Sequence, residues 1–146
     1  MSRKDKAMKL FTEGANCAQA VLGAFAEECN LSYDEAMKLA SGFGAGMGRM
    51  REVCGAVSGM ILVANLRCAS ADLQDKKAKD DHYALIQKLA DEFKKENGSI
   101  VCRELLGLAK NENTTPISEA RTETYYKKRP CAELVGIAAD ILEKNL

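Results

Sequence analysis

The residues of this chain best suited to chemistry are its six cysteines. Four of them occupy positions where we expect a helix to begin or to have just begun: Cys17, Cys54, Cys102 and Cys131. Backbone N–H groups that are free at a helix start, together with the positive end of the helix dipole, stabilise a thiolate. Such a site lowers the pKa of a cysteine from about 8.5 toward the range in which sulfur reacts or binds metal. We therefore assign the function to these four residues.

The other two cysteines, Cys29 and Cys68, are expected near helix ends. Carbonyl groups crowd a helix end and disfavour a thiolate, so these two should matter less. The chain contains no C-x-x-C pair, no C-x-x-C-H haem motif, and a single histidine, His82, which we expect to be a partly buried structural residue. Any shared site must therefore be assembled by the fold, and haem is not expected.

Three roles remain open for the four cysteines. They could bind an iron-sulfur cluster or zinc, as four-thiolate ligand sets do, for electron transfer or sensing. Two of them could instead form a reversible disulfide while a neighbour acts as the resolving thiol. In a non-catalytic helical interaction module they would simply fill the core, because buried cysteine behaves as a small hydrophobe.

A glycine-rich stretch, GFGAGMG, directly precedes Arg49 and leads to Cys54. It matches neither G-x-G-x-x-G nor G-x-x-x-x-G-K-[ST], and no strand is expected before it, so no nucleotide site is predicted. Its backbone N–H groups could form an anion-binding nest beside Cys54, although a hinge or a packing loop is the simpler interpretation. The residues proposed for the nest are Gly46, Gly48, Arg49 and Gly55.

Helical periodicity recurs from end to end, and no segment alternates like a strand. We predict an all-α, single-domain helical bundle of five to seven helices over residues 1–146. The expected helices cover residues 4–13, 17–28, 32–42, 50–68, 73–97 and 131–144, with a further short helix that carries Cys102. Asn16 is the expected N-cap of the second helix, the capping box of Ser32 and Glu35 opens the third, and Gly98 ends the long helix. Ser99 is expected to cap the short helix, and Pro130 to occupy the first position of the last one. Residues 110–116 are the best loop candidate.

Glycines recur at a fixed distance from the cysteines. Cys54, Cys102 and Cys131 each precede a glycine by five residues. Five residues place that glycine well round the helix from the thiol, so close helix packing is its expected role. In particular, Gly55 and Gly59 form a G-x-x-x-G ridge that lets another helix backbone approach.

The charge composition of the chain limits the kinds of partner that it could bind. Lys plus Arg and Asp plus Glu are 21 each, so no footprint for nucleic acid or an anionic membrane is visible. No apolar run approaches the roughly 20 residues of a transmembrane helix, and the polar N-terminus lacks the features of a signal peptide. We expect a cytoplasmic protein without membrane insertion, an unidentified redox partner, and a homodimer as the first assembly to consider.

These motifs resemble those of a redox-active protein family labelled C_GCAxxG_C_C. Asn16-Cys17-Ala18 resembles the first family cysteine, and Cys54-Gly55-Ala56-Val57-Ser58-Gly59 resembles the central motif, with C-G-A where the label has G-C-A. Cys102 in CRELLG and Cys131 in PCAELV resemble the third and fourth. The resemblance implies a helical fold and a redox role. The family is also similar to a domain of split-Soret cytochromes, whose haem motifs this chain lacks.

Overall fold

The computed structural model describes residues 1–108 and 114–146, and it confirms the all-α prediction. Within these residues there is no strand, and the isolated β-bridge joins Val53 to Val101. The helices are α1 (Arg3–Thr12), α2 (Cys17–Ala24), α3 (Tyr33–Ala40), the 3₁₀ turn η1 (Ser41–Phe43), α4 (Gly44–Met47), α5 (Gly55–Cys68), α6 (Lys76–Asn97), α7 (Cys102–Leu105), α8 (Glu123–Lys128) and α9 (Cys131–Asn145).

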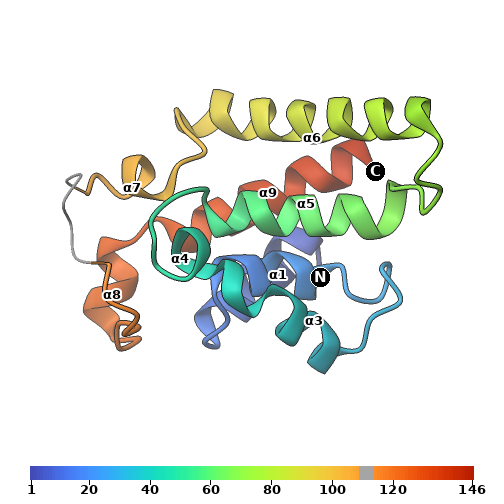
Figure 1. Ribbon diagram of the computed structural model, residues 1–146. Helices are drawn as coiled ribbons and strands as arrows, with labels where there is room; N and C mark the ends of the chain where they lie inside the picture. Colours follow the sequence, from blue (N-terminus) through green and yellow to red (C-terminus); the bar gives the residue numbers. More distant parts are fainter. Residues whose placement is uncertain (109–113) are drawn as a thin grey trace.

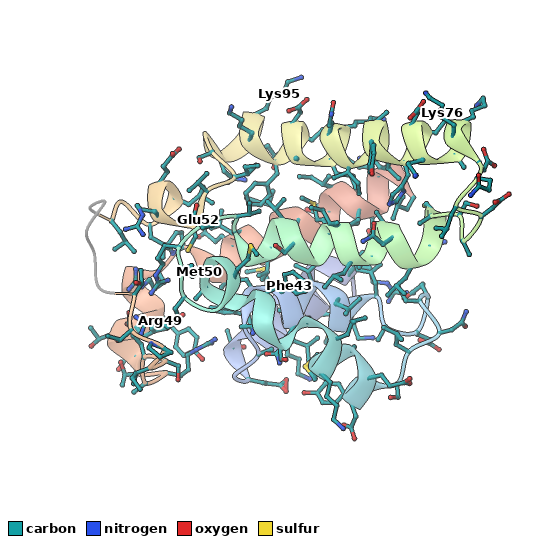
Figure 2. All side chains as sticks on the ribbon, viewed as in Figure 1. Phe43, Arg49, Met50, Glu52, Lys76 and Lys95 are labelled. Carbon is teal, nitrogen blue, oxygen red and sulfur yellow. The ribbon has the colours of Figure 1, made fainter. Side chains whose placement is uncertain are left out.

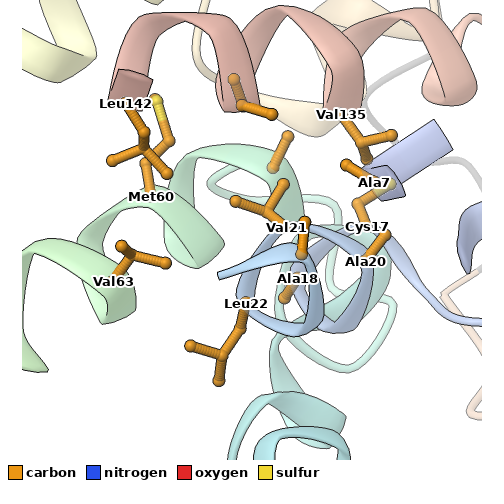
Figure 3. Close-up of a cluster of buried hydrophobic side chains, with 14 of the residues drawn as sticks. Ala7, Cys17, Ala18, Ala20, Val21, Leu22, Met60, Val63, Val135 and Leu142 are labelled. Carbon is orange, nitrogen blue, oxygen red and sulfur yellow. The ribbon is translucent and has the colours of Figure 1, made fainter. Parts of the chain in front are cut away.

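Helix α2 is the centre of the bundle. Every residue of α2 except Gln19 is buried, as expected for a helix that is apolar on all sides. It packs against α1, α3, α5 and α9. Figure 3 shows this core, in which Val21 of α2 lies among side chains of α5 and α9 such as Met60 and Val135. Cys17 belongs to the same cluster, so the first candidate thiol is anchored in the buried core of the fold.

Close packing of α5 on α2 depends on the predicted glycine ridge. A Cβ atom on Gly59 would lie 2.7 Å from Cβ of Val21, and one on Gly55 would lie 3.0 Å from Cβ of Cys17. The first distance is too short for a real side chain and the second is tighter than most real contacts, so the two glycines let the backbones approach closely. The packing role predicted for this pair is confirmed.

Helix α6 is the most peripheral of the long helices. It lies along α5 and α9, with Leu89 and Phe93 fully buried and charged side chains along its outer face (Figures 1 and 2). Gly98 ends α6 with φ of 87°, a left-handed conformation, as predicted. Among the described residues, no helix is both long enough and apolar enough to cross a bilayer.

Several predicted boundaries are wrong by a few residues. Helix α2 stops at Ala24, not Glu28, because the chain continues in turns with i to i+3 hydrogen bonds, such as Phe25 N–H to Leu22. Helix α5 starts at Gly55, not Met50, because Arg49 and Arg51 have positive φ values that no α-helix contains.

The starts of three further helices also differ from the prediction. Helix α6 starts at Lys76, because the Asp75 side chain accepts from the N–H of Ala78. Ser99 is not the N-cap of α7, which is Val101, although its hydroxyl accepts from the N–H of Val101 and donates to Glu104. Pro130 is the N-cap of α9 and not its first residue. The loop predicted at residues 110–116 lies largely outside the described residues, and residues 114–116 belong to no helix.

Candidate functional site

Each of the four selected cysteines begins a helix. Cys17, Cys102 and Cys131 are the first residues of α2, α7 and α9, and Cys54 is the N-cap of α5. This confirms the predicted helix-start context. All four are buried, with exposed fractions between 4% and 8%, so their thiols meet solvent through a cavity and not at an open surface.

The start of α2 is fixed by a capping box. The Asn16 side chain accepts from the N–H of Gln19, and the Gln19 side chain accepts from the N–H of Asn16. The amide of Asn16 also donates to the carbonyl of Ser41. A Cβ on Gly44 would lie 2.4 Å from this amide, so glycine is required where α4 passes the start of α2.

A short β-bridge positions Cys54 and Cys102 together. The N–H of Cys54 donates to the carbonyl of Ile100 at 2.7 Å, and the N–H of Cys102 donates to the carbonyl of Glu52 at 2.6 Å. These two bonds flank the antiparallel bridge between Val53 and Val101. Two cysteines 48 positions apart in the printed sequence are thereby fixed on neighbouring backbones.

A run of left-handed residues builds the wall next to these cysteines. Ala45, Met47, Arg49 and Arg51 all have positive φ, although none is glycine. Strain of this kind persists only where the surroundings enforce it, and it concentrates at functional sites. Here the N–H of Arg51 donates to Ala45, and the N–H of Arg103 donates to the carbonyl of Arg51. These hydrogen bonds therefore hold Arg51 in a backbone conformation that is unfavourable by itself.

The four cysteines line one cavity of about 390 Å³. It lies at the end of the bundle where α4, α7 and α8 meet the starts of α5 and α9 (Figure 1). Its walls also include four arginines and one carboxylate, Glu119, besides apolar side chains. The volume falls within the range of small-molecule sites. The fold thus brings together four cysteines whose positions around one cavity could not be derived from the sequence.

Cys17 and Cys131 interact directly. Their thiols share a hydrogen bond, in which the Cys17 S–H donates to the Cys131 sulfur. This bond lowers the pKa of Cys131, and Arg129, Arg121 and Arg51 lower it further against the opposing effect of burial. The pKa of Cys17 is raised well above its ordinary value by the same hydrogen bond and by burial. The pair therefore consists of one thiolate-forming sulfur and one protonated donor.

The pKa values of Cys54 and Cys102 are also raised. Burial raises the pKa of Cys54 to about 12, although the N–H groups of Ala56 and Val57 oppose it. Burial also raises the pKa of Cys102, against the lowering effect of the Arg51 guanidinium, whose Nη1 lies 3.7 Å from its sulfur. The expectation that all four helix starts lower the cysteine pKa is wrong for three of them. Desolvation and neighbouring thiols outweigh the helix dipole there.

The two arginines that flank α8, Arg121 and Arg129, were not predicted as site residues. Arg121 donates to the carbonyls of Phe11 and Ala15, and its guanidinium lies 4.4 Å from the centroid of the Phe11 ring. Arg129 donates to Glu119 at 2.6 Å. Arg129 lies two positions before Cys131, which was the sequence feature that could have identified it as a site residue. No nearby sequence feature pointed to Arg121. Both residues bring positive charge to the Cys131 sulfur.

The four residues proposed for an anion nest all border the cavity: Gly46, Gly48, Arg49 and Gly55. The N–H groups of Gly48 and Arg49 already donate to the carbonyl of Gly44. The Arg49 side chain donates to the carbonyls of Thr115 and Ile117. Figure 2 labels Arg49 at this end of the molecule. Gly46 cannot carry a side chain, since a Cβ there would lie 2.7 Å from Cβ of Cys102.

The cavity offers thiol donors, but their present arrangement does not form a metal centre. Within residues 1–108 and 114–146, no three His, Cys, Asp or Glu side chains are placed so that they could hold a metal ion. Four cysteines are a suitable ligand set by chemical type. Side-chain rearrangement would be needed before they could act as one.

The remaining candidates lie elsewhere. Cys68 ends α5 and is exposed, and Cys29 follows α2 in a turn, where burial raises its pKa. Neither cysteine borders the cavity. His82 is half-buried, and its Nε2 lies 2.6 Å from Oδ1 of Asn65, which confirms its predicted structural character.

A helical protein with four cysteines around one cavity is the class that fold and site define. A family model described as "Putative redox-active protein (C_GCAxxG_C_C)" matches residues 15–145. The chain therefore belongs to this redox-active family. It is also 29% identical over 150 residues to an uncharacterized protein of Archaeoglobus fulgidus, covering 98% of this chain and 92% of that relative. No solved structure matches the chain.

Proposed function

We propose that this protein performs dithiol-disulfide redox chemistry and that Cys17 and Cys131 are the reacting pair. The observation that carries the proposal is the hydrogen bond between their thiols inside the cavity. Disulfide formation needs two sulfurs that approach each other, and the hydrogen bond and the shared cavity both place the Cys17 and Cys131 thiols near each other. The pKa of Cys131 is lowered, and thiolate is the form of cysteine that attacks disulfides.

The cycle uses a partner disulfide as its oxidant. The Cys131 thiolate attacks one sulfur of the partner, so that a mixed disulfide forms, the partner S–S bond breaks and a partner thiolate leaves. Cys17 then loses its proton and attacks the Cys131 sulfur, which closes the Cys17–Cys131 bond and releases the second partner thiolate. Two protein thiols are oxidised and one partner disulfide is reduced to two thiols.

Cys54 and Cys102 have a supporting role in this proposal. Both are buried beside the pair, and both act electrostatically on Cys17. Their raised pKa values keep them protonated while Cys131 reacts. Core filler alone is a weaker account, because a charged cavity surrounds the thiols.

Redox titration in glutathione buffers, with thiols counted after acid quenching, tests the proposal. We expect the wild-type protein to lose two thiols reversibly. Cys17→Ser and Cys131→Ser should each abolish that two-thiol step, whereas Cys68→Ser, on the exposed end of α5, should leave it unchanged. A step that survives in both pair variants would contradict the assignment.

A four-thiolate centre holding an iron-sulfur cluster or zinc is the second candidate. The observation that favours it is that all four cysteines face one cavity from four helix starts. Metal, iron and sulfide analysis of anaerobically purified protein tests it. Stoichiometric metal that is lost in every one of the four cysteine-to-serine variants would support the centre. Metal-free protein with a working two-thiol step would exclude it.

Our proposal includes a cytoplasmic location and an unidentified redox partner. A reducing compartment would return the Cys17–Cys131 disulfide to thiols after each cycle. The partner would supply the disulfide named above.

A further inference from the structure

The buried guanidinium of Arg51 lines the cavity. Arg51 is 6% exposed, and its Nε has no hydrogen-bond partner in the part of the chain that the structure describes. Its Nη1 contacts the Cys102 sulfur at 3.7 Å. No carboxylate of the described residues forms an ion pair with it. Burying a charge in this state is costly unless a counter-ion arrives.

The other three arginines of the cavity are already engaged. Arg49 and Arg121 donate to backbone carbonyls, and Arg129 is paired with Glu119. With the Cys131 sulfur ionised, the described cavity wall still has more guanidinium groups than negative charges. Arg51 is therefore the group to which an incoming anion would bind.

The left-handed backbone fixes the position of the Arg51 main chain at the cavity wall. Its φ is 62°, and its N–H and carbonyl are both hydrogen-bonded, to Ala45 and Arg103. Gly46, which tolerates no side chain, packs against its Cα, since a Cβ there would lie 2.8 Å from that atom. A strained and fully tethered segment presents this side chain to the cavity.

The cavity is large enough for an organic molecule and not only for an inorganic ion. Its volume is about 390 Å³, and Phe11, Leu105 and Leu134 contribute apolar surface. A planar guanidinium pairs well with a carboxylate, often through two parallel hydrogen bonds. A small molecule with a carboxylate at one end and sulfur at the other matches both features.

We propose that the cavity binds a small carboxylate-bearing disulfide, whose carboxylate pairs with Arg51 while one of its sulfurs meets Cys131. This substrate class rests on the dithiol-disulfide cycle proposed above, in which the molecule is the oxidant and leaves as two thiols. The anion site itself needs only a reactive sulfur near the Arg51 guanidinium, whose Nε has no hydrogen-bond partner among the described residues.

Alkylation of Cys131 by two reagents of similar size tests the anion site without any disulfide. Iodoacetate carries a carboxylate, whereas iodoacetamide is neutral. Reaction at Cys131 is followed by peptide mass, and the ratio of the two rates is divided by the same ratio for the urea-unfolded protein. We expect a ratio well above one for the wild-type protein and a decrease of about tenfold in Arg51→Gln, since hydrogen bonds to charged groups are worth that much.

Two further variants control for charge and folding. Arg51→Lys keeps the charge and should retain a preference for iodoacetate. Arg129→Gln removes a cation that is already paired with Glu119, so it should slow both reagents together and leave the ratio unchanged. A wild-type ratio near one, or a ratio unaffected by Arg51→Gln in a folded variant, would overturn the anion site.

A charge series of disulfides tests the substrate class. 3,3′-Dithiodipropionate is anionic, bis(2-hydroxyethyl) disulfide is neutral and cystamine is cationic, and all three are short linear molecules. We expect the rate of Cys131 oxidation to fall in that order and the order to disappear in Arg51→Gln. If alkylation shows the anion preference but no disulfide oxidises the pair, the site stands and the dithiol cycle fails. Equal oxidation rates for all three would overturn the substrate class.

Discussion

The hydrogen bond between Cys17 and Cys131 makes two chemically identical residues unequal. The donor sulfur keeps its proton, and the acceptor sulfur becomes the better thiolate, with three arginines adding to the difference. Burial pushes Cys54 and Cys102 in the opposite direction. At the residue scale, these pKa differences therefore predict an order of reactivity among four thiols that line one cavity.

We predict that Cys131 is the first cavity thiol to be alkylated. Its pKa is lowered, so its thiolate forms at a lower pH than that of an ordinary cysteine, whereas Cys54, with a pKa of about 12, is still protonated there. Iodoacetamide labelling of the reduced protein from about pH 6 to about pH 10, read by peptide mass, gives the pH midpoint of Cys131, and Cys54 should show no midpoint in this range, which brackets the reference pKa of cysteine.

The same experiment contains its own control. In Cys17→Ser the weaker S–H donor is replaced by a hydroxyl that can still donate, so the Cys131 midpoint should stay low. In Cys17→Ala the donor is lost, and the Cys131 midpoint should rise. A Cys131 midpoint that is indifferent to Cys17→Ala would contradict the hydrogen-bonded pair.

Gly46 provides a second test at the residue scale. Its φ is 69°, and a Cβ would lie 2.7 Å from Cβ of Cys102 and 2.8 Å from Cα of Arg51. Gly46→Ala should lower the free energy of unfolding by about 1–3 kcal/mol through strain and steric conflict. Chemical denaturation measures this loss.

Gly42→Ala is the matched control, because Gly42 lies in the same glycine-rich stretch and has nothing within 4 Å of its would-be Cβ. It should leave stability within about 0.5 kcal/mol of the wild type. Equal effects of the two substitutions would show that the packing at Gly46 is not as tight as described.

At the scale of elements, the sequence predicted most helices because their signals are local. The capping box of Ser32 and Glu35, the N-cap Asn16 and the terminating Gly98 all lie where expected. The bridge between Val53 and Val101 could not be predicted, because it pairs distant backbones without a strand pattern. The shared cavity could not be predicted for the same reason. The pKa order depends on burial, which also follows only from the assembled fold.

Gly59 and Gly136, which each lie in a helix five residues after a cysteine, should respond differently to substitution. A Cβ on Gly59 would meet Cβ of Val21 at 2.7 Å, whereas one on Gly136 would meet the flexible end of Met8, its Sδ at 2.9 Å. Gly59→Ala should therefore destabilise the protein by about 1–3 kcal/mol, because α2 and α5 must separate.

Gly136→Ala should be much milder, because Met8 can move and alanine gains up to about 1 kcal/mol of helix propensity over glycine. The comparison is made by thermal or urea unfolding of both variants. A milder effect at Gly59 than at Gly136 would contradict the packing described for α2 and α5.

At the scale of the whole molecule, buried thiols make stability depend on alkaline pH. The pKa of Cys54 is raised to about 12 in the folded state, above its value in the unfolded chain. Between those two values the unfolded state binds fewer protons than the folded state, so stability falls as pH rises. The stability that the protonated Cys54 thiol contributes is fully present below the pKa of this cysteine in the unfolded chain, and it is lost as pH approaches about 12.

Urea unfolding at a series of alkaline pH values should show this decline from about pH 8.5 upward, with a limiting slope near 1.4 kcal/mol per pH unit for one group. Cys54→Ala should reduce the slope, although it also lowers the overall stability. A slope that is unchanged in this variant would assign the alkaline loss to other groups.

The most direct test of the central claim is to locate the disulfide. The reduced protein is oxidised with a small disulfide, its remaining thiols are blocked at acidic pH, and the bonded peptides are identified by mass spectrometry without reduction. The account predicts a peptide pair that joins Cys17 to Cys131. A bond that joins Cys54 to Cys102 instead, or an oxidised protein in which all four cavity thiols remain free, would contradict it.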